Sequence, residues 1–511
     1  MHGKNSVLLL ADQPYQTRLL AKLAERLQEC DLKPCLVLTD WFSFLYEPAL
    51  IEEIKRNGID IRTQEEMFFT WQGNDPGDEQ VIESQLKNWE KKNCLSRSLA
   101  QLELTNNYVF SNERRAYELP VERTWERRIL LDSITWIEQI FDEIEPSIVF
   151  AIDNCTLINN LSNAISEKRN IPHLICKNTR IRERWVARDD FCLGMSAKNV
   201  RKAETVAGSH AYDEEVQAYR EWFSTHNRGA YKATAHLVSA DSSGKSIASA
   251  VGAFSRDLAD WLLRSLGRIR PSAGLRRMGI VRFEQSLSRL SWVELRVAWV
   301  RFLAAIGHHP FESFSPPAEE NYIFWALHSR PEGSVLTQAF GQDEEALLEF
   351  FASQATDGLS ILVKEHPDMF GLRQADFYKR LKRLQSIRLV APWATTIDYL
   401  RGARAVVGVA GTVLLEAEIL GKPAWSLGKP EFSAYLAGSG TDGIQDFLAK
   451  LIQGDFNEYQ SRIDNYLAFV MSESSADDDW LNDNQIPFEK QDSRHTVDRM
   501  YRLITKELEE G

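Results

Sequence analysis

The sequence predicts an α/β protein with two doubly wound, Rossmann-like domains and a helical insertion between them. Short, continuous apolar runs, typical of buried parallel strands, alternate with helical patterns in both halves of the chain. A stretch with a different, arginine-rich composition separates the two halves. With 511 residues the chain can form two to four domains, each with its own core.

The N-terminal half, residues 1–200, contains a repeated strand–helix–strand pattern. Asp12 follows the first apolar run, and Asp153 and Asn154 follow the third. No G-x-G-x-x-G comes after the first strand, so the dinucleotide-binding fingerprint is missing. The predicted strands are 7–11, 34–39, 147–152 and 171–176, and helices are predicted at 15–29 and 156–168.

The same alternation starts again in residues 316–480. An amphipathic pattern in residues 481–511 then predicts a C-terminal helix over 492–508. The predicted strands of this second α/β domain are 322–327, 360–363, 386–390, 405–409 and 423–427, and its predicted helices are 343–354, 396–400 and 413–420.

Residues 201–315 form the predicted helical insertion. From Arg256 to Arg301 the sequence has ten arginines, no lysine and four acidic residues, with three tryptophans interleaved. Two interpretations remain open. The segment is either an interfacial helix pair for an anionic membrane leaflet, or a packing element whose arginines are solvated or ion-paired.

Composition excludes some functions and limits others. A net charge of −13 argues against a general nucleic-acid binder. The six cysteines have no metal-ligand spacing, and we expect reduced thiols. With no signal-peptide pattern and no apolar run long enough to cross a bilayer, we expect a cytoplasmic protein with at most peripheral contact with the inner membrane. Asp477-Asp478-Asp479 reads as a solvated loop, so no metal site is expected.

Two segments of the second α/β domain have residues suited to binding phosphate. Lys364-Glu365-His366-Pro367 directly follows a predicted strand, where a lysine and a histidine can meet anionic charge. Gly411-Thr412 opens a predicted helix whose first amides can bind an anion. Glu416 lies one turn further on and can accept hydrogen bonds from a ribose or base.

A third segment follows the strand that opens this domain. It runs from His328 through Glu332 to Ser334, and we expect it to face the cleft between the domains. The Lys364 and Gly411 segments each also have an ordinary structural interpretation as a strand-end turn. The order of the three segments along one domain is what favours a binding site.

Together these segments resemble the bacterial capsule and surface-polysaccharide biosynthesis transferases, a group that includes the Kdo transferases. The resemblance rests on the K-E-H-P turn, the G-T-x-x-x-E-A-x-x-x-G-K-P stretch and the strand that ends in a His and a Pro-Glu. The His-Pro turn is also similar to the nucleotide-phosphate turn of bacterial sialyltransferases. The resemblance is clearest over 321–430 and weaker over 146–190, where Asp153 and Thr179-Arg180-Ile181 match loops that line the cleft.

The resemblance implies a GT-B fold, no active-site metal and no cofactor beyond the nucleotide-sugar donor. Asp153 is the first candidate for base or nucleophile and Asp12 the second, while His366 would stabilise the departing phosphate. Asn154 and Arg180 would bind the acceptor or an anion. The donor-binding residues implied are His328, Glu332, Lys364, Glu365, His366, Pro367, Gly411, Thr412 and Glu416. The turn Ala410-Gly411-Thr412 lacks one hydroxyl that the family often has, which leaves the donor open.

The expected function is transfer of a sugar from a nucleotide donor to a surface-polysaccharide or glycolipid acceptor, which can be lipid-linked. Kdo or another acidic sugar from a CMP donor is the first candidate. One alternative is a CDP-polyol phosphotransferase of the teichoic-acid type, which has a similar His-Pro turn. Another is a non-catalytic assembly protein that keeps the GT-B scaffold.

Overall fold

The structure is a computed structural model of the 511-residue chain. It describes residues 5–11, 14–38, 48–63, 77–93, 98–99, 102, 123–152, 156–181, 184–188, 194–225, 247–269, 281–312, 321–329, 343–354, 359–373, 375–453, 459–474 and 494–510.

The N-terminal domain is built on a six-stranded sheet in the order β3-β2-β1-β4-β5-β6. All neighbouring strands are parallel except β5 and β6, which form an antiparallel hairpin. The strands are β1 (Ser6–Ala11), β2 (Lys33–Leu38), β3 (Asp60–Thr63), β4 (Ile148–Ile152), β5 (His173–Asn178) and β6 (Trp185–Arg188). The helices of this half are α1 (Pro14–Gln28), α3 (Pro48–Arg56), α5 (Glu79–Asn93), α7 (Arg123–Ile144) and α8 (Leu157–Arg169).

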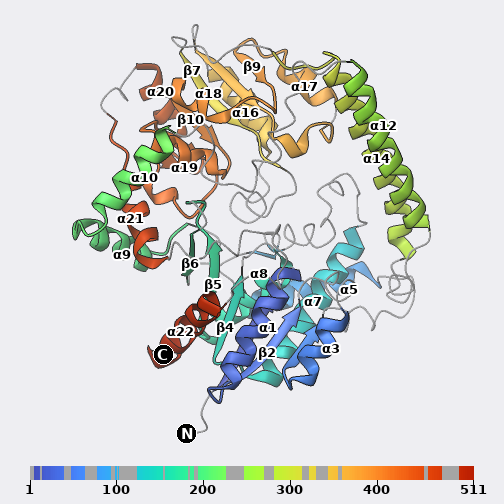
Figure 1. The fold of residues 1–511 in the computed structure, drawn as a ribbon, viewed down its shortest axis with the longest axis vertical. Helices are drawn as coiled ribbons and strands as arrows, with labels where there is room; N and C mark the ends of the chain where they lie inside the picture. Colours follow the sequence, from blue (N-terminus) through green and yellow to red (C-terminus); the bar gives the residue numbers. More distant parts are fainter. Residues whose placement is uncertain are drawn as a thin grey trace.

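The C-terminal domain repeats this topology with the order β12-β11-β10-β7-β8-β9, all parallel. Its strands are β7 (Tyr322–Ala326), β8 (Ser360–Lys364), β9 (Ile387–Val390), β10 (Ala405–Gly408), β11 (Ala424–Ser426) and β12 (Gly438–Ser439). Its helices are α16 (Glu344–Gln354), α17 (Ala375–Leu381), α18 (Thr396–Gly402), α19 (Thr412–Ile419), α20 (Ile444–Gln453) and α21 (Ile463–Glu473), with short 3-10 turns η3 (Pro367–Met369) and η4 (Ser433–Tyr435). Two doubly wound domains of this kind make a GT-B fold, and the predicted fold class is confirmed (Figure 1).

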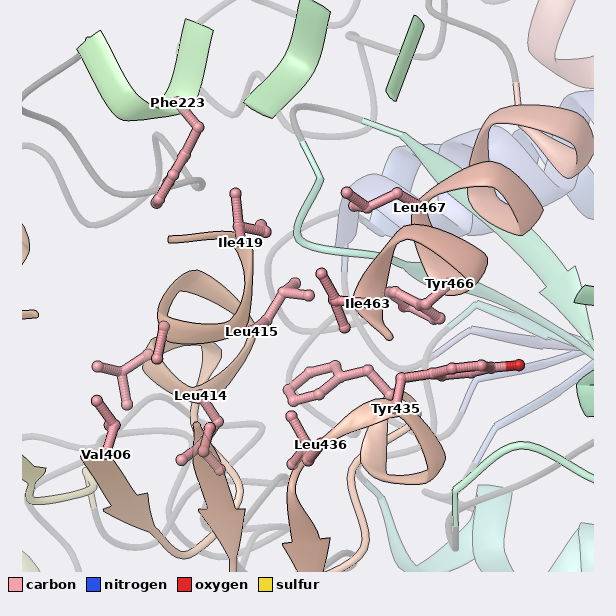
Figure 2. Close-up of a cluster of buried hydrophobic side chains, with 14 of the residues drawn as sticks. Phe223, Val406, Leu414, Leu415, Ile419, Tyr435, Leu436, Ile463, Tyr466 and Leu467 are labelled. Atoms are coloured by element: carbon pink, nitrogen blue, oxygen red, sulfur yellow. The ribbon is translucent and has the colours of Figure 1, made fainter. Parts of the chain in front are cut away.

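The chain crosses between the two domains more than once. Helices α9 (Ala197–Gly208) and α10 (Asp213–Thr225) precede the C-terminal sheet but pack on α21, with Phe223 in the same buried cluster as Ile463 and Leu467 (Figure 2). In the other direction, α22 (Arg494–Glu510) returns to the N-terminal domain and packs on α1 (Figure 1). The beginning of the predicted insertion and the C-terminal helix therefore each complete the core of a domain.

The β5–β6 hairpin forms part of the junction between the domains. Ile181, in its turn, is fully buried in the cluster that also contains the C-terminal residues Leu415 and Tyr466. Lys177 on β5 pairs with the buried Glu431 at 3.3 Å. Gly194 approaches the same region so closely that a Cβ there would lie 2.9 Å from Ser433 Oγ.

The remainder of the insertion is a helical hairpin of α12 (Ile247–Ile269) and α14 (Val281–Ala305) on the flank of the molecule (Figure 1). The two helices meet through aromatic rings, with the centroid of Phe254 5.8 Å from Trp299 and 5.1 Å from Phe302. None of the helices in the described part of the chain combines the length and apolarity that a bilayer crossing requires.

Candidate functional site

Three loops meet at the carboxyl edge of the C-terminal sheet. From β7 the chain extends the sheet outward through β8 and β9, then returns to place β10 on the other side of β7. This reversal between β7 and β10 is a topological switch point, where open α/β sheets bind their ligands. The loops after β7, β8 and β10 contain the three segments that the sequence analysis selected: His328, Lys364 to Pro367, and Gly411-Thr412.

His328 connects two of these loops from a buried position. Its Nε2 accepts a 3.3 Å hydrogen bond from the backbone N–H of Ala410, and its Nδ1 lies 3.5 Å from Glu344 Oε1. Because Nε2 is an acceptor, the ring proton lies on Nδ1 and points to the carboxylate. The same carboxylate also accepts from the His328 backbone N–H at 3.2 Å. These contacts connect the loop after β7 to the loop after β10.

The turn after β10 presents the start of α19 to this edge. Gly411 is the N-cap residue and makes no side-chain capping bond, so the first turn of the helix has no cap from its own N-cap residue. Amides at such a helix start attract anions. Thr412 begins the helix and is partly exposed, and Glu416, one turn further, is buried.

The need for glycine at 411 is steric. Its φ of −76° suits any residue, but a Cβ there would lie 2.9 Å from Nε2 of His328. Glu344 holds that ring from the opposite nitrogen, which restricts its movement. At Gly408, by contrast, a Cβ would make ordinary contacts of 3.6 Å with Leu414.

We therefore expect Gly411→Ala to lower the free energy of unfolding by roughly 1–3 kcal/mol, the usual cost of forcing a methyl group into a packed site. The matched control is Gly408→Ala, which should unfold at the melting temperature of the parent. Scanning calorimetry measures both. Equal melting temperatures for the two variants would contradict the steric argument.

Lys364 is a buried cation at the end of β8. Its side chain is 6% exposed, and its Nζ donates to the carbonyl of Pro392 at 3.1 Å. Burial lowers the pKa of Lys364 to about 8, while the nearby carboxylates of Glu365 and Glu416 oppose the shift. The structure thus brings Lys364 and Glu416, from separate segments, within electrostatic reach of each other.

Glu365 is saturated by partners within the protein. Its carboxylate accepts from the guanidinium of Arg373 at 2.8 Å, from the hydroxyl of Tyr378 at 2.7 Å and from the backbone N–H of His366 at 2.7 Å. Burial raises the pKa of this carboxyl, and the Arg373 charge opposes that shift. These three contacts hold the backbone of the turn after β8 in place.

Arg373 ties the loops after β7 and β8 together. Besides pairing with Glu365, it donates to the backbone carbonyl of His328 at 2.7 Å and lies 3.6 Å from Glu344. Burial lowers the pKa of Arg373, but the charges of Glu365 and Glu344 together raise it above the usual value, so the guanidinium stays charged. Arg373, Glu344 and Tyr378 were not predicted from the sequence, because no motif marks a residue whose partners come from other loops.

His366 and Pro367 are partly exposed at this edge. The backbone of the turn is held on both sides, since the His366 N–H binds Glu365 and the His366 carbonyl accepts from Met369 at 3.0 Å. With the backbone anchored and the ring partly accessible, His366 is placed for direct contact with a ligand.

Four predicted site residues lie outside the described residues: Asp12, Asp153, Asn154 and Glu332. In sequence, Asp12 follows β1 and Asp153 follows β4, and these strands are adjacent and parallel. The described ends of β1 and β4 thus flank the switch point of the N-terminal sheet.

Arg180 belongs to the turn of the β5–β6 hairpin, at the junction of the domains. Its backbone φ is +65°, a left-handed conformation that non-glycine residues adopt uncommonly. The neighbouring Thr179 hydroxyl holds the turn by donating to the Arg184 carbonyl at 3.0 Å. In the described part of the chain, no group of three or more His, Cys, Asp or Glu side chains is arranged to hold a metal ion.

Comparison with known families gives one match. Residues 336–445 match the model of the capsule polysaccharide biosynthesis proteins, which confirms the resemblance over this part of the C-terminal domain. The matched segment contains Lys364, His366, Gly411 and Glu416. Among curated proteins, no sequence matches the chain.

Solved structures with similar folds share little sequence with this chain. The KpsC β-Kdo 2,4-transferase of Thermosulfurimonas dismutans is 12% identical, with 64% of this chain and 79% of that chain covered and a TM-score of 0.32. The UDP-GlcNAc 2-epimerase of Neisseria meningitidis is 12% identical, with 90% and 98% covered and a TM-score of 0.25. A glycosyltransferase from Rickettsia africae is 8% identical, with 99% and 100% covered and a TM-score of 0.27. At TM-scores below 0.5 these likenesses support no functional conclusion.

Proposed function

We propose that this protein is a glycosyltransferase that moves a sugar from a nucleotide donor to a surface-polysaccharide or glycolipid acceptor. The observation that carries the proposal is the convergence of Lys364, His366 and the start of α19 at the switch point of the C-terminal sheet. The family match over 336–445 covers these same residues and supports the same proposed function.

In this reaction an acceptor hydroxyl attacks the anomeric carbon as the bond from that carbon to the phosphate oxygen breaks. Negative charge develops on the departing nucleotide phosphate. The Lys364 ammonium, the His366 ring and the amides at Gly411-Thr412 would stabilise it, as fixed charges and dipoles that need no rearrangement. The buried Glu416 would accept hydrogen bonds from the nucleoside.

The proton of the acceptor hydroxyl must pass to a base from the N-terminal domain. Asp153 is our first candidate and Asp12 the second, because each follows a strand at the switch point of that sheet. We further propose a CMP-linked acidic sugar, such as Kdo, as donor and a glycan or lipid-linked glycan as acceptor, with a cytoplasmic location.

A panel of nucleotides tests the proposal. The nucleotide of the true donor should raise the melting temperature most among CMP, CDP, UDP and GDP, because ligands that bind only the folded state stabilise it. Release of free sugar from the matching donor should follow. Turnover of CDP-glycerol or CDP-ribitol would replace the proposal with a polyol-phosphate transferase. Lack of any response to the panel would favour a non-catalytic scaffold.

We expect His366→Ala to lower turnover by roughly 10²–10³, the usual loss when one group that stabilises developing charge is removed. Its melting temperature should stay at the parent value, since the ring is partly exposed and the backbone anchors are kept. His308→Ala, at an exposed histidine of the loop after α14, is the control. Parental kinetics in His366→Ala would remove this residue from the site.

We also expect chelation to leave the activity unchanged. In the proposed chemistry, protein cations and backbone amides stabilise the phosphate, so no divalent ion has a role in the reaction. Initial rates measured with and without EDTA check this. A loss of rate that Mg²⁺ or Mn²⁺ restores would show that the reaction depends on a metal.

A further inference from the structure

The helical hairpin α12–α14 exposes a concentration of apolar side chains found nowhere else in the described part of the chain. Eight large hydrophobic side chains are exposed among the described residues, and six of them lie on these two helices. We call this set the hairpin patch: Val251, Leu258, Leu262, Leu263, Trp292 and Trp299. Single exposed hydrophobic residues are ordinary, but a group of this kind marks an interaction surface.

Members of the patch on the two helices lie at matching levels along the hairpin. The helices run antiparallel, and Phe254 of α12 contacts Trp299 and Phe302 of α14. Eight residues further along α12, about 12 Å at the helical rise, Leu262 comes to the level of Trp292. The largest exposures occur at this level, with Leu263 and Trp292 both 68% exposed and Leu262 51% exposed.

The charge of the two helices is opposite to that of the whole chain. They contain seven arginines, no lysine and four carboxylates, a net charge of +3, whereas the chain has a net charge of −13. Arg256 is exposed within the same stretch as Leu258. Arginine together with tryptophan and leucine is typical of helices that lie in a membrane interface.

We propose that the α12–α14 hairpin docks this protein on an anionic lipid surface. Leucine and tryptophan side chains of the hairpin patch would enter the interface between headgroups and acyl chains. Arginines near an anionic leaflet add electrostatic attraction to this contact. The contact is peripheral, in keeping with the finding that no described helix can cross a bilayer.

The hairpin is joined firmly to the site described above. Val297 of α14 packs on Met369 and Leu372, and Arg296 donates to the carbonyl of Leu372 at 2.9 Å. Gly371 has a φ of +88°, and a Cβ there would lie 3.2 Å from the Val297 Cα, so the fit is tight. This segment follows His366 directly. A lipid surface bound by the hairpin would therefore be held at a fixed distance from the candidate site.

Sedimentation with vesicles tests the lipid-docking proposal without any assay of sugar transfer. The outcome is therefore independent of whether the proposed function is correct. The full chain should sediment with vesicles that contain phosphatidylglycerol, stay in the supernatant with pure phosphatidylcholine, and be released by salt, which screens the attraction. The triple variant Leu262→Ser, Leu263→Ser, Trp292→Ser should lose at least tenfold in vesicle affinity, and Arg256→Glu should weaken binding to the anionic vesicles.

The matched control changes the other two exposed hydrophobic residues, Val81 and Ile452, to serine. This control should bind vesicles like the parent. All substituted side chains are exposed, so each variant should melt at the parent temperature, which scanning calorimetry checks.

Failure of the parent to sediment at low salt would overturn the proposal, as would binding by the triple variant equal to that of the parent. Light scattering tests the alternative that a second copy of this chain binds the hairpin patch. A parent dimer that the triple variant converts to monomer, with no vesicle binding, would make the hairpin patch an interface between copies of this chain.

Discussion

Arg373→Met should lower the melting temperature of the C-terminal domain by on the order of 10 °C. The substitution leaves the Glu365 carboxylate, 1% exposed, without its ion-pair partner at 2.8 Å. Removing one member of a buried pair typically costs about 3–5 kcal/mol, because the other charge stays buried and uncompensated. For a domain of this size each kcal/mol shifts the melting temperature by about 2–4 °C. The carbonyl of His328 also loses its donor.

Arg380→Met is the matched control. Arg380 is also an ion-paired arginine of the same domain, with Glu345 and Asp376 as partners, but its side chain is 41% exposed. Exposed pairs contribute roughly 0–1 kcal/mol, so this variant should melt within a few degrees of the parent. Scanning calorimetry of both variants decides the matter. Similar shifts for Arg373→Met and Arg380→Met would mean that the buried network does not stabilise the domain.

The sequence predicted the central strands of both sheets closely. The expected strand at 405–409 is β10 (Ala405–Gly408), and the expected helix at 413–420 is α19 (Thr412–Ile419). Central parallel strands are buried on both faces, so their apolar runs stand out against amphipathic helices. Strands β3, β6 and β12 were missed. All three lie at sheet edges, where polar positions break the apolar pattern, and β12 is only two residues long.

The site was predictable only as far as it follows strand ends. Lys364, His366 and Gly411 come directly after apolar strands, and the sheet order brings those strands together. The roles of His328 and Glu365 depend on Glu344 and Arg373, which lie on other segments. Such long-range pairs have no local pattern, so a ligand contact and a positioning contact look alike in sequence.

Lys364→Met should remove most nucleotide binding and lower turnover by roughly 10²–10³, because it deletes the buried cation to which we assign stabilisation of the departing phosphate. It should do so without destabilising the protein. The pKa of Lys364 is lowered from 10.5 to about 8 by burial, and holding the ammonium in the fold at pH 7 therefore costs on the order of 3 kcal/mol. Glu416 loses a neighbouring cation in the variant, which offsets part of the gain. The melting temperature should stay near or above that of the parent.

The pH dependence separates a binding role from a structural one. As pH rises through about 8, free parent protein loses the Lys364 proton, so its nucleotide affinity should fall by up to tenfold per pH unit. The stability contribution of Lys364 has the opposite sign. Between pH 8 and 10.5 the unfolded chain keeps a proton that the folded chain has lost, so folding becomes more favourable as pH rises. Lys364→Met should show neither trend.

Lys422→Met is the control for both trends. Lys422 is a half-buried lysine of the same domain, also with a lowered pKa, but it precedes β11 and so lies at the amino edge of the sheet, opposite the candidate site. The Lys422→Met variant should bind the nucleotide with the parent affinity, and that affinity should fall above pH 8 as it does in the parent. Calorimetric titrations of the parent and both variants from pH 7 to pH 9 provide the comparison. If Lys364→Met bound the nucleotide with the affinity and pH dependence of the parent, the buried lysine would have no part in holding the donor phosphate.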